Sequence, residues 1–388
     1  MAHRRGRSGL AASLALAIAL VACAPGAPAT PAASGPPGAP SSATAPPASA
    51  ELQALPALPA VIEAARQEGQ LSFLWSGRLF GGEEGLRRIT EGMNSRYGLA
   101  TTIQYTPGVP SVELTRRLIS EHQAGRPNAT DIVSTPVADT VTLIRAEALL
   151  PVDWPSWAPS IQDPSLFGAR GMAVESNSYL PGITYSSSRV TGAAVPRSME
   201  DLLKPEYRGR IASTPPATWF NYLGAPEIWG AQRMLDYISR FSDQVAGLIG
   251  CSDKERLVIG EFDLFAIDCS NSETMRLHAQ GQPIDFVLPS DLPVLGTRYV
   301  SIPRRAPHPA TAKLWIDYLL SREGQDLLYE VDNVDNVRIP GSNTARDVAA
   351  LQAGGRALVH VDLDFYARND EAELDRLRAL TQQIIRKQ

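Results

Sequence analysis

The chain is poor in the side chains on which many catalytic and metal sites depend. It has 3 cysteines and 5 histidines among 388 residues. The patterns G-x-S-x-G, H-E-x-x-H and G-x-x-x-x-G-K-[ST] are all missing, which argues against an α/β-type serine hydrolase, a zinc peptidase and a P-loop nucleotidase. We therefore expect a protein that is not an enzyme and that needs no cofactor and no bound metal.

Basic charge and long apolar runs are scarce as well. The 36 Lys and Arg residues are outnumbered by 41 Asp and Glu residues, giving a formal net charge of −5. This balance argues against nucleic acid as a partner. Beyond the N-terminus no apolar stretch reaches the roughly 18 residues that a membrane-spanning helix needs.

What the sequence does have is an N-terminus that reads as an export signal. A basic start precedes an apolar run over residues 10–22, which ends in Leu20-Val21-Ala22-Cys23. This ending resembles the bacterial lipoprotein cleavage box, in which the cysteine takes a diacylglycerol. We expect a signal peptide over 1–22, lipid on Cys23, and a location outside the cytoplasm, on the periplasmic side or at the cell surface. Ordinary secretion with an unmodified cysteine is the alternative.

The next segment predicts a tether rather than a folded domain. Residues 24–50 consist of Ala, Pro, Gly, Ser and Thr alone, so the segment has no large apolar side chains to bury. We expect an extended linker over residues 23–54. After Cys23, the remaining cysteines are Cys251 and Cys269, and an isolated pair in an oxidising compartment tends to form a disulfide. Two separate buried thiols are the alternative.

From residue 55 onward, helical and strand patterns alternate, which predicts an α/β fold. The length exceeds what one hydrophobic core usually supports, so two lobes are expected. The expected helices cover 59–68, 82–97, 111–124, 229–241 and 370–387, and the expected strands cover 71–75, 99–105, 131–133, 183–185, 210–212, 262–267 and 284–288.

Three stretches resemble one family. They begin at Ala64-Ala65-Arg66-Gln67-Glu68-Gly69, at Ser198-Met199-Glu200-Asp201-Leu202-Leu203 and at His308-Pro309-Ala310-Thr311-Ala312-Lys313. Together they resemble the iron(III)/polyamine/phosphonate type of extracellular solute-binding protein of ABC importers. The resemblance implies a two-lobed type II periplasmic-binding fold, with residues 55–180 in lobe 1, 181–290 in lobe 2 and 291–388 returning to lobe 1. It also implies an ABC permease as partner, and we expect a monomer.

Because ligands of open parallel sheets bind beyond the carboxyl ends of the strands, three loops are candidate binding segments. Arg78 could bind a carboxylate or phosphonate through two hydrogen bonds. Thr135 and Thr214 fit the pattern of helix N-caps, whose free N–H groups favour an anion. Solvation of the arginine and plain capping are the alternatives. The predicted residues of these loops are Trp75, Ser76, Arg78, Ser134, Thr135 and Thr214.

Further candidates are Tyr185, Trp219, Asp268 and Asp291. Trp219 could stack on a ligand, and either carboxylate could bind an ammonium group. We therefore expect a small anionic or zwitterionic solute. A ferric-ion-binding protein is an alternative, although the adjacent tyrosines of ferric-binding relatives are missing. A ligand-sensing subunit is another, and an exported enzyme is the least favoured.

Overall fold

The computed structural model describes residues 55–75 and 78–386. The predicted signal peptide, the lipid at Cys23, the tether and Ser76 lie outside these residues. The described residues belong to one compact unit.

The first lobe begins with alternating helices and strands, as the pattern predicts. In the helix over 82–97, Leu86, Ile89 and Met93 recur at spacings of three and four and are buried, and Gly98 ends the helix with a φ of 63°. The elements are α2 (Leu58–Glu68), β1 (Gln70–Trp75), α3 (Gly82–Tyr97), β2 (Thr102–Pro107), α4 (Ser111–Gln123), β3 (Val133–Pro136) and α5 (Val137–Arg145).

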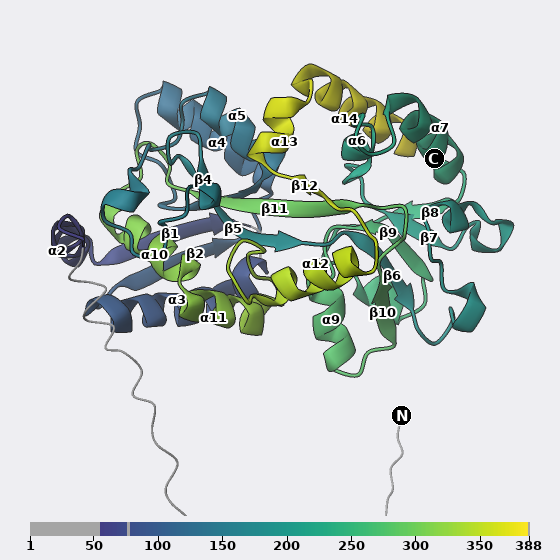
Figure 1. Ribbon diagram of the computed structural model, residues 1–388, viewed down its shortest axis with the longest axis horizontal. Coiled ribbons are helices and arrows are strands. Elements are labelled where there is room, and N and C mark those ends of the chain that lie inside the picture. The colour runs from purple at the N-terminus through teal and green to yellow at the C-terminus, as the bar shows by residue number, and fades with distance from the viewer. Residues whose placement is uncertain (1–54, 76–77, 387–388) are drawn as a thin grey trace, which may run out of the picture. The chain divides into compact units, whose positions relative to one another are not determined.

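Long strands connect the two groups of elements in Figure 1. After β4 (Phe167–Gly168), the chain runs through β5 (Ala173–Tyr179) directly into β6 (Gly182–Ser186), and it returns through β11 (Val294–Ser301). Strand β11 pairs antiparallel with β5 and with β3. The chain thus crosses close to the segments that the resemblance implies, near 180–186 and 288–300. The lobe boundaries themselves stay a prediction.

The second lobe is built on a five-stranded sheet of order β10-β6-β9-β7-β8. The pairs β7–β8 and β7–β9 are parallel, whereas β6 pairs antiparallel with β9 and β10. Strand β6 enters straight from β5 without a crossover helix, so the sheet is mixed. The elements are β7 (Ile211–Ser213), α6 (Phe220–Leu223), α7 (Ala231–Ser242), β8 (Val245–Leu248), α8 (Glu255–Val258), β9 (Leu264–Asp268), α9 (Ser272–Ala279) and β10 (Ile284–Val287).

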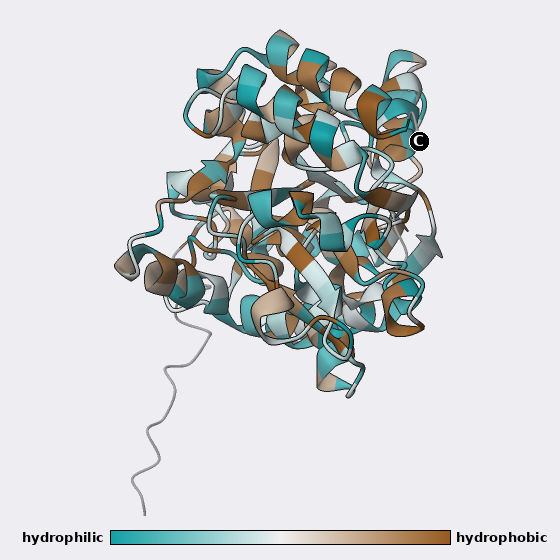
Figure 2. Cartoon of the chain, turned by 90° about the vertical axis from the view of Figure 1, so that its right-hand side faces the viewer, coloured by the Kyte–Doolittle hydropathy of each residue, from teal (hydrophilic) through white to brown (hydrophobic). Residues whose placement is uncertain are grey.

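The remaining chain packs on both lobes. Helix α10 (Pro309–Leu320) contacts α2 and α3, and α11 (Arg322–Asp332) contacts α3. After α12 (Asn343–Ala353), β12 (Val359–Val361) pairs with β11, and α13 (Leu363–Arg368) leads to α14 (Glu371–Ile385). Helix α14 packs against α6 and α7 of the second lobe through buried residues that include Leu374 and Leu377. Hydrophobic and hydrophilic residues alternate along the helices (Figure 2), as expected for helices buried on one face.

Candidate functional site

Four buried polar atoms lack a partner in three strands or in the segments that follow them. They are the indole Nε1 atoms of Trp75 and Trp219 and the hydroxyls of Ser134 and Ser213. Buried polar atoms are nearly always hydrogen-bonded. Six other unpartnered buried atoms occur in the described residues, and one of these, the hydroxyl of Ser301, lies at the end of β11. The four are grouped because β1, β3 and β7 come from both lobes, and ligands of such folds bind beyond the strands. The four atoms are therefore candidate ligand contacts.

Trp75 is mainly a core residue. Its ring is 2% exposed and packs on Phe73 and Phe80 at centroid distances of 5.1 and 5.2 Å. Only its unpartnered Nε1 is left for a ligand, so the indole can donate a hydrogen bond but does not present an open stacking face.

Arg78 has a partner of its own. Its Nε lies 3.2 Å from a carboxylate oxygen of Glu273 on α9, and 57% of its side chain is exposed. The ion pair joins the segment after β1 to the second lobe. Arg78 thus shares one carboxylate with Arg276, whose guanidinium lies 2.6 Å from Glu273, and part of its charge is balanced within the protein.

The predicted helix caps at Thr135 and Thr214 are wrong. Thr135 lies within β3, and its hydroxyl is 2.7 Å from that of Thr140, while α5 has no side-chain cap. Thr214 accepts a hydrogen bond from the backbone N of Thr218 at 3.0 Å, which closes a turn. Helix α6 begins only at Phe220, because the residues before it include two with positive φ. Both threonines lie near the strand ends, but they do not open helix N-termini toward a ligand.

Trp219 lies in a strained and tightly packed position. Its φ is 76°, in the left-handed region that non-glycine residues rarely adopt. The ring packs against Tyr179 at 5.5 Å and Tyr222 at 5.6 Å. A Cβ on Gly296 of β11 would lie 2.3 Å from the Trp219 ring, so the glycine is what allows this ring to reach the crossing strand.

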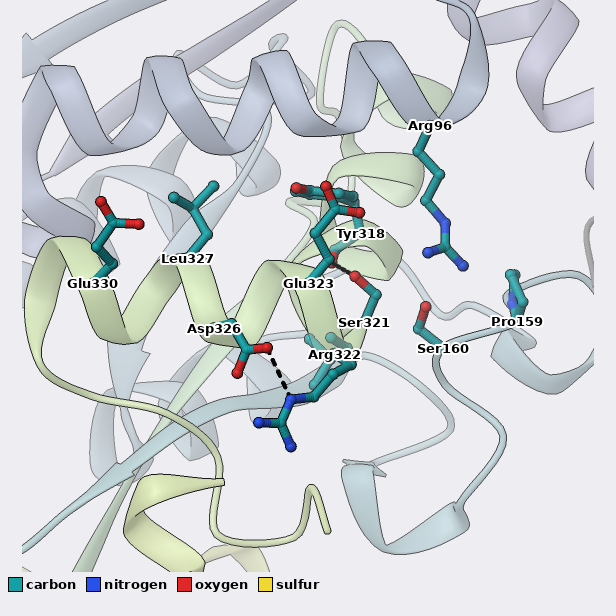
Figure 3. A pocket seen from close by; sticks show the side chains of 11 residues that line it. Arg96, Pro159, Ser160, Tyr318, Ser321, Arg322, Glu323, Asp326, Leu327 and Glu330 are labelled. Atoms are coloured by element: carbon teal, nitrogen blue, oxygen red, sulfur yellow. Dashed lines mark hydrogen bonds and ion pairs between the residues drawn. The ribbon is translucent and has the colours of Figure 1, made fainter. Parts of the chain in front are cut away.

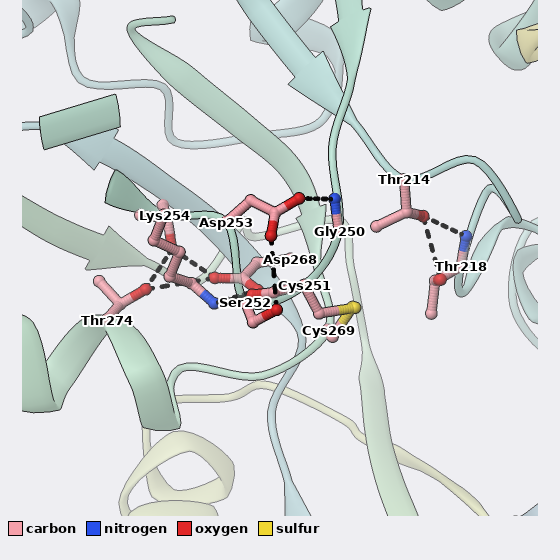
Figure 4. The surroundings of a disulfide bond; sticks show 11 residues. Thr214, Thr218, Gly250, Cys251, Ser252, Asp253, Lys254, Asp268, Cys269 and Thr274 are labelled. Carbon is pink, nitrogen blue, oxygen red and sulfur yellow. Dashed lines mark hydrogen bonds and ion pairs between the residues drawn. A yellow bond between two sulfur atoms is a disulfide. The ribbon is translucent and has the colours of Figure 1, made fainter. Parts of the chain in front are cut away.

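The other predicted residues contact residues of the second lobe. Asp268 is fully buried and lies 2.9 Å from the Lys254 Nζ atom (Figure 4). Asp291 accepts a hydrogen bond from the backbone N of Met199 at 2.7 Å, and the Tyr185 hydroxyl donates to Asp285 at 3.4 Å. None of the three contacts the four unpartnered atoms in the described structure.

Arg298 on β11 was missed by the sequence analysis. Its Nη1 donates to the backbone O of Ser134 at 3.4 Å, which places the guanidinium next to one of the predicted loops. The signal was present, since Arg298 is the only charged residue in β11. Ser213 was within a predicted loop but was not selected.

Asp332, at the end of α11, lies where the two lobes meet. It accepts hydrogen bonds from the backbone N of Phe80 at 2.9 Å and from the hydroxyl of Ser272 on α9 at 3.0 Å. Burial raises the pKa of Asp332 to about 7, an effect that Ser272, Phe80 and the charge of Arg298 partly oppose.

This pKa predicts how stability depends on pH. A carboxyl whose pKa is raised by folding stabilises the protein below the unfolded value of about 4, and this contribution is lost as the pH rises toward 7. We expect Asp332→Asn to match the wild type near pH 4 and to be more stable by about 1–3 kcal/mol at pH 8. Urea unfolding at both pH values measures this. Parallel curves for the two proteins between pH 4 and 8 would contradict it.

Two surface pockets contain none of the predicted residues. One, of about 780 Å³, lies between α11 and the ends of α3 and α10 (Figure 3), and its Arg322 already pairs with Asp326 at 2.9 Å. The other, of about 880 Å³, lies between α5 and the α13–α14 segment, where Arg145 pairs with Glu371. Neither lies at the strand ends that hold the unpartnered atoms.

The predicted disulfide between Cys251 and Cys269 is confirmed. The two Cα atoms are 5.8 Å apart, and the bond closes a segment that contains α8 (Figure 4). Within residues 55–75 and 78–386, no group of three or more His, Cys, Asp or Glu side chains is placed to hold a metal ion. Over the same residues, every helix is too short or too polar to cross a bilayer.

The comparisons with known proteins point to one family. A protein of Haemophilus influenzae described as uncharacterized is 24% identical over 195 residues, 46% of this chain and 52% of the relative, so the chain spans about half the length of this curated relative. The substrate-binding protein of an ABC transporter from Agrobacterium tumefaciens has a TM-score of 0.66 at 18% identity, covering 83% of this chain and 97% of that one.

The apo ferric ion-binding protein A of Pasteurella haemolytica has a TM-score of 0.60 at 18% identity, covering 81% of this chain and 98% of that one. These likenesses confirm the two-lobed type II periplasmic-binding fold. The profile of bacterial extracellular solute-binding proteins matches residues 151–352, just over half of the chain. The chain therefore belongs to the bacterial extracellular solute-binding protein family.

Proposed function

We propose that this chain captures a small polar solute, anionic or zwitterionic, outside the cytoplasmic membrane and delivers it to an ABC permease as a lipid-anchored monomer. The observation that carries the proposal is the set of four buried, unpartnered polar atoms in or after strands of both lobes. Two of them, on Trp75 and Trp219, can only donate hydrogen bonds, and the two serine hydroxyls can donate or accept. Donors that have no acceptor partner in the described structure suit a solute that carries negatively charged oxygen atoms.

A ferric ion is less well supported, although one structural neighbour is a ferric ion-binding protein. Iron would need several oxygen ligands in one place. The buried tyrosines near Trp219 are poor sources of phenolate, since burial raises the pKa of Tyr222 to about 12. A ligand-sensing role would use the same site, and only the presence of a permease partner separates it from transport.

A melting screen tests the solute class. Phosphonates, carboxylates, polyamines, thiamine and ferric citrate are added to the purified protein. A true ligand at 100 times its dissociation constant stabilises the fold by about 2.7 kcal/mol, which is a clear shift of the melting temperature. The proposal expects the shift with an anionic or zwitterionic compound. A shift with a polyamine or ferric citrate alone would contradict it.

Anchoring through Cys23 has its own test. We expect Cys23→Ala to remove the protein from the membrane fraction or to block its processing, because a lipid on this residue is the proposed membrane attachment. Fractionation followed by mass spectrometry of the mature N-terminus measures this. A mature protein that starts at another residue and has no acyl chain would show that the attachment is different.

A further inference from the structure

Arg298 carries a charge into the middle of a crossing strand. In β11 it pairs with Asn177 of β5 and with Pro136 of β3, at a register shift that falls between Arg298 and Tyr299. The side chain is half-buried. A cation in such a place usually has a partner of opposite charge, because desolvation of an unpaired charge is costly.

No such partner is found in the described residues. No carboxylate there makes an ion pair with Arg298, and its one hydrogen bond goes to the Ser134 backbone O at 3.4 Å. Arg338 shows the contrast, because its guanidinium lies 2.8 Å from both Glu175 and Asp362. Arg298 thus keeps hydrogen-bond donors that the protein itself does not satisfy.

The contacts of the neighbouring residues show on which face of β11 the Arg298 side chain lies. On one side, Thr297 contacts His360, and the Tyr299 hydroxyl accepts from the backbone N of Leu363. Gly296, which alternates with Thr297, faces the ring of Trp219. Because side chains alternate along a strand, Arg298 lies on the same face of β11 as Gly296.

This side of β11 also holds unpartnered groups. Trp219 and Ser134 each contribute a buried donor without a partner, and the Arg298 guanidinium lies against the Ser134 backbone. The charge of Arg298 also acts on Tyr179, which packs on Trp219. The guanidinium of Arg298 and the two neutral donors of Ser134 and Trp219 thus lie on one face of the crossing strand.

We propose that Arg298, rather than Arg78, binds the oxyanion group of the solute, with Ser134 and Trp219 as neutral donors beside it. This inference rests on the proposed function and assigns its specificity to a residue of the crossing strand. A guanidinium binds a carboxylate, phosphonate or phosphate through two parallel hydrogen bonds, whereas it repels an ammonium group or a metal cation. Arg78 is the weaker candidate, because its side chain is 57% exposed and lies 3.2 Å from Glu273, a carboxylate that it shares with Arg276.

The neighbouring Asp332 provides a second readout. The charged groups that act on this carboxyl are Arg298 on β11 and Glu273 on α9, and its donors are Phe80 and Ser272. An anion on Arg298 cancels the field of that cation and so raises the pKa of Asp332 further. Near pH 7, the wild type should therefore take up more protons on binding than Asp332→Asn does, by up to about half a proton per solute.

Calorimetry with three probes tests the inference. They are 2-aminoethylphosphonate, β-alanine as its carboxylate analogue and ethylamine as the shared amine without an oxyanion. We expect the wild type to bind at least one of the first two and not ethylamine. Arg298→Gln should weaken that binding about 100-fold, because hydrogen bonds to a charged group are lost. Arg298→Lys should weaken it about 10-fold, since the charge stays but the fork is lost, and Arg78→Gln less than about 3-fold.

The outcomes separate the residue from the function. If Arg78→Gln abolishes binding and Arg298→Gln does not, the assignment to Arg298 is wrong and the proposed function stands. If ethylamine binds and neither oxyanion does, or if no probe binds, then both the proposed anionic class of solute and the role of Arg298 are wrong. If Arg298→Gln does not fold, the affinity of Arg298→Lys is measured instead, provided that its melting temperature equals that of the wild type. An unaltered affinity in that variant would overturn the inference.

Discussion

Replacing Lys254 with methionine is expected to lower the free energy of unfolding by about 3–5 kcal/mol, because it leaves a buried carboxylate without its cation. The side chains of Lys254 and Asp268 are 2% and 0% exposed, and their charged atoms lie 2.9 Å apart. The Lys254 Nζ also donates to the backbone O of Cys251 at 2.9 Å. Urea unfolding followed by circular dichroism at pH 7 measures the loss.

A double variant is the matched control. Combining Lys254→Met with Asp268→Asn removes both charges, so most of the loss should be recovered. The amide of the asparagine can still accept the hydrogen bond that Thr184 donates to Asp268 at 2.5 Å. A single variant that loses less than about 1 kcal/mol, the range of an exposed ion pair, would show that Asp268 reaches water or another cation.

The second large effect is expected from the disulfide. Replacing both Cys251 and Cys269 with serine should lower the free energy of unfolding by about 3 kcal/mol, because the unfolded chain regains the freedom of the closed loop. The two residues are 18 positions apart. Urea unfolding with and without reductant measures the effect, and reductant should change the wild type but not the variant. Peptide mapping that finds both thiols free in the exported protein would contradict the prediction.

These two effects should not be additive. Cys251 and Lys254 lie in the short segment before α8, and the backbone O of Cys251 is a partner of the Lys254 ammonium (Figure 4). Once the disulfide is absent, this segment can move, so Lys254→Met should cost less in that background.

Local patterns predicted helices well where the apolar periodicity of the helix and the residue that ends or caps it are close together in the sequence. The helix over 82–97 matches α3 at both ends, because Gly98 ends its apolar pattern. Asp370 caps α14 by accepting hydrogen bonds from two backbone N–H groups. Helix α6 was placed too early, because nothing local shows that Trp219 adopts a left-handed conformation before it.

The site was harder to predict because charge pairing is a property of the tertiary structure. Arg78 and Arg298 look alike in the sequence, yet only Arg78 meets a carboxylate, from Glu273 far along the chain. Asp268 was selected for its place at a strand end, and its partner Lys254 lies before the strand. The rule that ligands bind at strand ends identified the loops of Trp75, Ser134 and Thr214, but it could not tell which of their atoms lack a partner in the described structure.

Because α14 packs on the second lobe, folding of that lobe depends on the last part of the chain to be synthesised. Leu374 and Leu377 are buried, and the helix covers α6 and α7, so the second lobe cannot complete its core until the last helix has left the ribosome. Roughly 130 residues separate the end of α7 from the start of α14, which at about 5–20 residues per second takes on the order of 6–25 seconds. During that interval the apolar faces of α6 and α7 are open to chaperones and proteases, and a nascent chain cut short before Glu371 leaves them open permanently.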